Sequence, residues 1–313
     1  MKGRHSLLVL LVLTILLAGA ALFIGPVSNP SWAIIQGIRF PRVLLAIIVG
    51  AGLAGAGAVL QGVLRNPLAD PFILGTSSAA AAGVVLASVL GFQHYSMLYF
   101  MSIGFALASI FVVYRIAQIN GKAPIQTIIL AGVIVSLFFN AVVFLFFSIF
   151  YRESFTMLFY LLGTLTEGSW TLIGISASII TLGLGLTWFF SRELNMLTQG
   201  ETTAFHLGVD VETVKKLLFV VASTLVAASV AVAGMIGFVG LIVPHMMRMI
   251  VGPDHRLLIP ASALGGAIFL ILADALARTI MPPLEIPVGA LTALLGSPYF
   301  VYLLRTRQNA GEF

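Results

Sequence analysis

The chain has no cysteine among its 313 residues, and this absence excludes disulfides, thiolate metal sites and a cysteine nucleophile. Charge is scarce as well, because Asp, Glu, Lys and Arg make up 9% of the residues, where soluble domains carry about 25%. So few charges could not cover the surface of a soluble fold, whereas lipid requires no such cover. With 60% hydrophobic residues, the composition indicates an integral membrane protein surrounded by lipid.

Long apolar runs fill most of the sequence. Since a spanning helix takes about 20 apolar residues, a chain of this length can form roughly ten spans. Turn residues and charges interrupt the hydropathy, and these breaks predict an all-α polytopic membrane protein that forms a single domain over 1–313. The expected spans are 6–24, 41–63, 72–91, 96–118, 124–149, 170–190, 215–234, 237–251, 257–281 and 287–304.

Two segments need separate interpretation. Lys2 and Arg4 precede an apolar run that passes through Ala18-Gly19-Ala20, as in a secretory signal peptide with a small-residue cleavage site. The run continues through Ile24, which is long enough to span, so a retained first helix is favoured. The stretch 151–169 is too polar for a full span and is expected to form a short helix near the interface.

The basic residues predict the orientation. They stand singly between apolar runs, which does not indicate a nucleic-acid partner and fits membrane orientation better. With a cytoplasmic N-terminus, most of the 16 Lys and Arg fall on the cytoplasmic side. This imbalance predicts an even number of spans with both termini in the cytoplasm. The exceptions, which fall outside, are Arg39, Arg42, Arg152 and Arg278.

Two nucleotide-binding patterns can be tested directly on the sequence. Residues 50–55 match G-x-G-x-x-G, but they lie inside an apolar run with no strand before it. Small residues at this spacing instead favour close helix packing. The chain has no G-x-x-x-x-G-K-[ST], so ATP-driven transport would require nucleotide binding on another chain.

The longest polar interruption runs from about 192 to 216. Thr198 and Glu201 have the spacing of a capping box, which predicts a short helix ending near Leu207. Gly208 suits the left-handed end of that helix, and Asp210 suits the N-cap of the next one. Two short helices at a membrane face are either a solvated connection or a docking element for a cytoplasmic partner.

Charges near the outer ends of the spans form a second group. Asp274 and Arg278 are four residues apart on one helical face, and an ionised carboxylate at that depth is costly unless paired. We therefore expect a structural ion pair. Arg39 and Arg42 either snorkel to lipid headgroups or receive carboxylates from an external protein.

Polar side chains inside the spans are sparse, as illustrated by Gln61, Gln126 and Asn140. No Asp, Glu or His relay crosses the midplane, which argues against a secondary transporter driven by an ion gradient. The histidines show no metal-ligand spacing, and no catalytic set at a common depth indicates an intramembrane enzyme. We expect neither catalytic residues nor a metal site.

Ordered motifs along most of the chain carry a family resemblance. They are RFPR at 39–42, GAVLQG at 57–62, RNPLADP at 65–71, GMIGFVGLIVPH at 234–245, GPDHR at 252–256, LADALAR at 272–278 and GSPYF at 296–300. On these motifs the chain resembles the permease subunits of bacterial ABC importers for iron–siderophore, haem and cobalamin complexes.

The resemblance implies a type II ABC importer permease with ten transmembrane helices in the cytoplasmic (inner) membrane of a bacterium or archaeon. It implies a homodimer, although a heterodimer with a second permease is an alternative. Two ATPase subunits would use ATP and Mg²⁺, an extracytoplasmic binding protein would deliver the cargo, and this chain would hold no cofactor. The sequence does not say which metal chelate is the cargo.

The resemblance also assigns roles to individual residues. Three arginines would take carboxylates from the binding protein: Arg39, Arg42 and Arg278. A second group would couple the permease to the ATPase: Thr198, Glu201, His206, Gly208 and Asp210. A third would line the path or its cytoplasmic gate: Gln126, Thr127 and Asn140.

Overall fold

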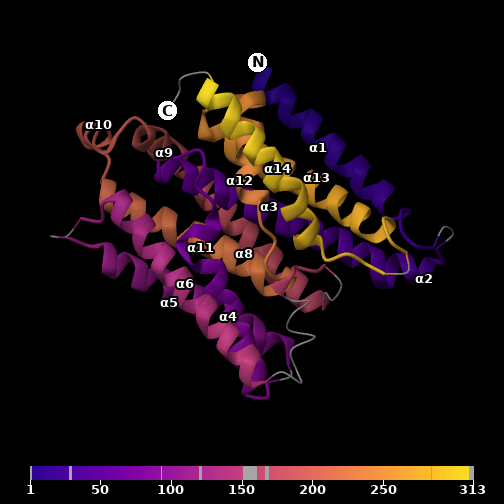
Figure 1. Ribbon diagram of the computed structural model, residues 1–313. Coiled ribbons are helices and arrows are strands. Elements are labelled where there is room, and N and C mark those ends of the chain that lie inside the picture. Colours follow the sequence, from indigo (N-terminus) through magenta and orange to yellow (C-terminus); the bar gives the residue numbers. More distant parts are fainter. Residues whose placement is uncertain are drawn as a thin grey trace.

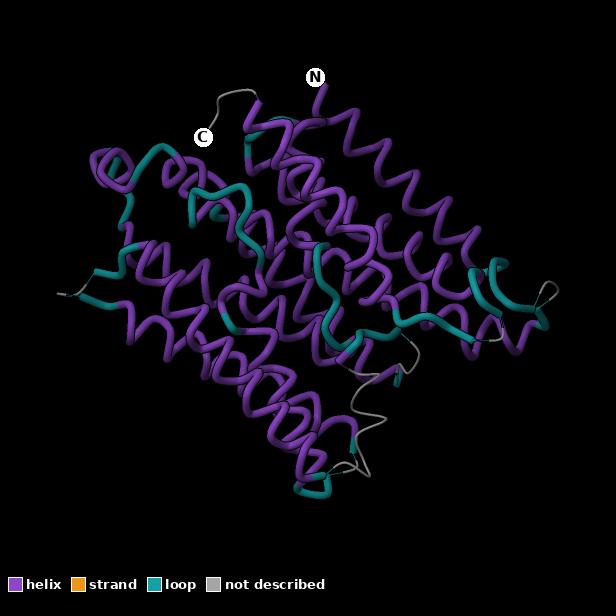
Figure 2. Tube along the Cα trace, in the orientation of Figure 1, coloured by secondary structure: helices purple, strands orange, loops and turns teal. Residues whose placement is uncertain are grey.

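The structure is a computed structural model that describes residues 2–27, 30–92, 94–119, 122–150, 161–165, 169–282 and 284–309. Its regular elements in these ranges are helices joined by short loops, with an isolated bridge between Ile119 and Lys122 (Figure 2). The elements are α1 (Lys2–Ala21), α2 (Trp32–Ile34), the π-helix η1 (Ile35–Arg39), α3 (Phe40–Val63), the 3₁₀-helix η2 (Pro71–Leu74), α4 (Thr76–Val89), α5 (Tyr95–Ala117), α6 (Ile125–Ile149), α8 (Trp170–Phe189), α9 (Ser191–Thr198), α10 (Glu201–His206), α11 (Val211–Ala233), α12 (Val239–Val251), α13 (His255–Thr279) and α14 (Val288–Asn309).

Six helical stretches of the described chain are long and apolar enough to cross a bilayer: 32–63, 96–117, 125–149, 170–189, 211–233 and 255–279. Four shorter apolar helices, at 5–21, 76–89, 239–251 and 288–301, occupy the positions of the remaining expected spans. The chain is therefore an all-α multi-pass membrane protein. The count of ten spans stays a prediction.

The second span begins earlier than expected. Its helix starts at Trp32, where the Ser31 side chain accepts the Ile34 N–H, and it runs through η1 into α3. In the wider π turn the N–H of Phe40 donates to the carbonyl of Ile35. The π turn lies directly before Pro41, which has no backbone N–H to donate within the helix.

The third expected span, 72–91, is interrupted near its start. Gly75 has φ +76°, a left-handed conformation that glycine adopts readily. A Cβ at this position would lie only 3.1 Å from the backbone nitrogen of Ser136 in α6. Gly75 therefore separates η2 from α4 and also lets this turn lie close against α6.

Close backbone contacts hold the centre of the bundle. Helix α3 is largely buried and packs against α11, α12 and α13. A Cβ on Gly50 would overlap the backbone of Gly266 in α13, and one on Gly57 would overlap the backbone of Gly240 in α12. This confirms the interpretation that the small residues at 50–58 serve helix packing.

Figure 1 shows the start of α1, the end of α14 and the pair α9–α10 toward one side of the bundle, with α2 toward the other. This arrangement agrees with the expected even number of spans, which together with the orientation stays a prediction. Helix α1 packs along α13, and its residues Thr14 and Ala21 are buried. The short helix expected at 151–169 lies mainly outside the described residues.

Candidate functional site

An ionic cluster lies where α3, α13 and the segment before α14 meet. The guanidinium of Arg42 donates from Nε to Asp274 Oδ1 and from Nη1 to Glu285 Oε2, both at 2.7 Å. Arg278 Nη2 lies 3.1 Å from Asp274 Oδ2, so the ion pair expected from the sequence is present. Asp274 is only 1% exposed and is held between two arginines. This pairing is what makes a buried carboxylate tolerable.

Two arginines also hold the end of α1. Arg39 donates to the carbonyl oxygens of Leu22 and Val27, at 3.0 and 2.8 Å. Arg278 donates to those of Ile24 and Ala21, at 3.1 and 3.4 Å. Of these acceptors, Ala21 is the last residue of α1 and the other three belong to the loop that follows it. Arg39 of η1 and Arg278 of α13 therefore hold the end of α1 and the following loop against the bundle.

Burial changes how these residues are interpreted. Arg39, Arg42 and Arg278 are 3–5% exposed, and their donors bind groups of the same chain. The idea that their guanidiniums project freely toward an external protein does not match this geometry. The ionic side chain of this cluster that reaches the surface is Glu285, at 37% exposure. Docking of a binding protein at this edge stays a prediction.

The segment 192–216 folds as two short helices, α9 and α10, followed by α11. Gly208 adopts φ +86° after α10, and Asp210 accepts the Thr213 N–H at 3.2 Å, so both expected helix signals are confirmed. The expected capping box is wrong. Thr198 is the last residue of α9, and its hydroxyl donates to the Asn195 carbonyl at 2.7 Å, so Gly200 takes the N-cap of α10.

Large apolar side chains on α10 and just after it face outward. Phe205 is 69% exposed and Leu207 is 59% exposed, with exposed His206 between them. A partner protein that covers these two side chains would remove their apolar surface from water. This geometry favours the docking interpretation of the segment.

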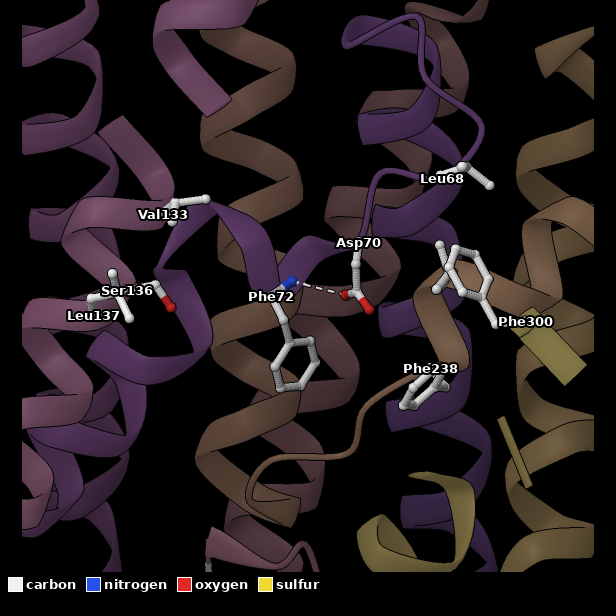
Figure 3. A pocket seen from close by; sticks show the side chains of 9 residues that line it. Leu68, Asp70, Phe72, Val133, Ser136, Leu137, Phe238 and Phe300 are labelled. Carbon is white, nitrogen blue, oxygen red and sulfur yellow. Dashed lines mark hydrogen bonds between the residues drawn. The ribbon is translucent and has the colours of Figure 1, made fainter. Parts of the chain in front are cut away.

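Two open cavities adjoin α6. One of about 460 Å³ lies between α6, η2, α12 and α14 and is lined by Leu68, Asp70, Phe72, Val133, Ser136, Leu137, Phe238, Leu241 and Phe300 (Figure 3). The other, of about 420 Å³, shares Phe72 and Ser136 and reaches Asn140, Leu161, Met235 and Gly289. Their walls are mostly apolar and aromatic, and the Asp70 carboxylate accepts the Phe72 N–H at 2.9 Å.

Irregular backbone borders both cavities. The stretch between α11 and α12 is not helical, and Phe238 has φ +67°, which is uncommon for a bulky residue. Thr164 N–H donates to the Ala233 carbonyl at 2.9 Å, and Gly289 N–H donates to that of Gly163 at 3.2 Å. Such backbone at membrane depth is tolerated where protein or a water-filled cavity surrounds it. Of the three path residues expected, Asn140 lines a cavity, whereas Gln126 and Thr127 lie in the first turn of α6.

Known proteins share this architecture. A family model described as the FecCD transport family matches residues 4–306. The chain belongs to the FecCD transport family. As a FecCD member it is a multi-pass transport permease of the ABC-importer type, and members of this family are transporter subunits, not enzymes.

Two curated relatives illustrate the similarity. The "Cobalamin import system permease protein BtuC" of Halobacterium salinarum is 45% identical over 90% of this chain and 76% of its own length. The "Hemin transport system permease protein HmuU" of Yersinia pestis is 38% identical over 98% of each chain. A solved structure of a proposed metal-chelate type ABC transporter, in an inward-facing conformation, superposes with a TM-score of 0.88 at 35% identity, covering 97% of this chain and 99% of the other.

Sequence reasoning missed one link in this FecCD permease. Asn195 of α9 accepts the His255 N–H at 3.0 Å and lies 2.7 Å from His255 Nδ1, while its amide donates to Asp254 Oδ1 at 2.7 Å. Asp254 also caps α13 by accepting the Arg256 N–H at 3.0 Å. One amide thus ties α9 to the start of α13. The cap was visible in the sequence as Pro-Asp before a helix, but its partner 59 residues away was not.

The Asp254 cap predicts an acid-sensitive junction. Burial would raise the pKa of the Asp254 carboxyl, but hydrogen bonds from Arg256 and Asn195 and the Arg256 charge outweigh it and hold the pKa below its ordinary value. The cap therefore stabilises the fold at pH above about 4, the ordinary carboxyl pKa, and is lost as the pH falls through the lower folded value. Thermal unfolding in detergent should show a smaller loss of stability from pH 5 to pH 3 in Asp254→Asn than in the unchanged protein. Equal losses would contradict the prediction.

Proposed function

We propose that this chain is the membrane subunit of an ATP-driven importer and works as a dimer of two copies. Two ATPase subunits bind ATP and Mg²⁺ on the cytoplasmic side, and an extracytoplasmic binding protein delivers the cargo. The chain crosses the cytoplasmic membrane ten times with both ends inside, as one domain, and holds no cofactor of its own. It provides the path, and the ATPase provides the energy.

The cargo class is a metal chelate. The relatives described above are named for cobalamin and hemin. The cavity walls support this class because aromatic side chains such as Phe72, Phe238 and Phe300 offer contact area without fixed charge. A large cargo passes most readily along a wall that binds it weakly at many points.

The dimer interface lies along α6. Outward-facing apolar side chains on this helix include Leu130, Ile134, Leu137 and Phe138, which are each more than half exposed in the single chain. The two cavities open beside this face. A second copy covering it would enclose the cavities between the two permeases and so complete a path.

The observation that carries the proposal is the α9–α10 unit, which presents exposed Phe205 and Leu207 at the side where α1 begins and α14 ends (Figure 1). The unit suits a groove on an ATPase. At the opposite side, the edge built over Arg42 and Glu285 is where the binding protein docks, and Arg39 and Arg278 shape that edge from beneath.

Uptake in proteoliposomes tests the proposal. With its ATPase and a cargo-loaded binding protein, the permease should accumulate a metal chelate only when ATP is supplied to the ATPase side. Omitting the ATPase or the binding protein serves as the control and should abolish uptake. Uptake driven by an ion gradient without either partner would overturn the proposal and favour a secondary transporter.

A further inference from the structure

A buried lysine lies where the segment 192–216, here called the coupling segment, meets the rest of the helical bundle. Lys215, in the first turns of α11, is 1% exposed, although a lysine is rarely buried unless its charge is paired. Its ammonium group lies 3.0 Å from Glu201 Oε1 and 2.9 Å from Glu212 Oε1. It also donates to the carbonyl oxygen of Ala123 at 3.1 Å.

These contacts use the whole donor capacity of the side chain. An ammonium group has three N–H donors, and Lys215 has three acceptors within hydrogen-bond distance. The acceptors come from different elements: Glu201 opens α10, Glu212 lies in α11, and Ala123 precedes α6. Lys215 therefore joins α10, α11 and the connection before α6 at one point.

A fourth element joins the same cluster. The Tyr114 hydroxyl, in the last turn of α5, donates to Glu212 Oε2 at 2.7 Å. The neighbouring Lys216 is exposed and lies over the Tyr114 ring at 5.4 Å without entering the ionic cluster. The cluster therefore also includes α5, the helix that precedes α6. Lys215 is the only cation in direct contact with both carboxylates among the ion pairs found in the described residues.

We infer that Lys215 is a positioning residue that ties α10 to the start of α6, so that displacement of α10 by the ATPase is transmitted to Gln126 and Thr127. The inference rests on the proposed function and adds to it the point of transmission. The ammonium group of Lys215 is buried, whereas the side chains of Glu201 and Glu212 are 35% and 25% exposed, so moving either carboxylate away leaves a buried charge less compensated. The start of α6 therefore follows α10 instead of moving independently.

Coupling efficiency gives the first test. In proteoliposomes with the ATPase and binding protein, Lys215→Met should keep ATP hydrolysis but lower the cargo imported per ATP by about fivefold or more, the scale of ordinary coupling between sites. Lys216→Met, the matched control on the neighbouring residue, should leave this ratio near wild type. An unchanged ratio in Lys215→Met would overturn the inference.

Gate accessibility gives a second readout that a purely structural role would not change. Because the chain has no cysteine, Gln126→Cys places one thiol in the first turn of α6. Its alkylation rate should differ between nucleotide-free and ATP-trapped complexes, and adding Lys215→Met should largely remove this difference while the ATPase stays bound. A difference that persists in full would count against Lys215 as the link.

A third variant covers the case in which Lys215→Met does not fold. Glu201→Gln keeps an oxygen acceptor but removes the charge. The cargo imported per ATP should therefore fall, but by less than if the contact between Lys215 and α10 were lost completely. A wild-type ratio in Glu201→Gln would also overturn the inference. If the unchanged complex imports nothing with ATP, the proposed function itself fails, which is a distinct result.

Discussion

Replacing Gly57 with alanine is expected to reduce the yield of folded protein to a small fraction of the wild-type yield. A Cβ at this position would overlap the carbonyl group of Gly240, and backbone cannot rotate away as a side chain can. Inserting even one methyl group into a tightly packed core costs typically about 1–3 kcal/mol, and more where backbone must shift. Moving α12 away would also disturb Gln61, whose amide donates to the carbonyls of Gly240 and Leu241 at 3.4 and 3.1 Å.

The measurement is the amount of monodisperse protein recovered in detergent, followed by its thermal unfolding. Gly174→Ala in α8 is the matched control, because a Cβ there meets nothing within 4 Å. Alanine is favoured over glycine inside a helix by about 1 kcal/mol, so the control should be neutral or slightly stabilised. If Gly57→Ala were recovered and unfolded like wild type, α3 and α12 would not be packed through this contact.

Hydropathy predicted the helices well because each long apolar run has one low-energy state in lipid, a helix that satisfies its own backbone. It also predicted the interruption between α11 and α12, because the expected spans 215–234 and 237–251 leave a break there. It did not predict the break at Gly75, which lies inside the expected span 72–91. The left-handed turn at Gly75 lies close against α6, and local sequence does not contain that information.

The contacts of the candidate site also divide into those that local sequence predicts and those that it does not. The pairs Asp274–Arg278 and Glu212–Lys215 are four and three residues apart, so helical spacing is enough to predict such contacts. Arg42 meets Asp274 across 232 residues, and this contact follows from the packing of α3 on α13. The count of basic residues predicted only the side of the membrane on which Arg39 lies. It did not predict that the guanidinium of Arg39 binds backbone carbonyls of the same chain.

Replacing Arg42 with methionine is expected to destabilise the permease strongly. The change leaves Asp274 with Arg278 as its remaining charged partner and leaves Glu285 without its 2.7 Å contact. Removing one member of a buried ion pair costs about 3–5 kcal/mol when it leaves a charge uncompensated. Because Arg278 still lies beside Asp274 and Glu285 is 37% exposed, we expect a cost at the lower end of that range. The fraction of protein that elutes as a single species, and its unfolding temperature, should both fall well below wild type.

Arg39→Met is the informative comparison. Arg39 is equally buried, but its donors bind the neutral carbonyls of Leu22 and Val27, so its loss strands no charge. An unsatisfied buried acceptor costs about 1–3 kcal/mol, and these carbonyls belong to half-buried Leu22 and exposed Val27, so this variant should be destabilised less than Arg42→Met. Arg42→Lys should recover only part of the loss, because one ammonium group lacks the planar fork that spans both carboxylates. If Arg42→Met instead folds like wild type and loses only its affinity for the binding protein, the arginine acts by docking rather than by holding α3 to α13.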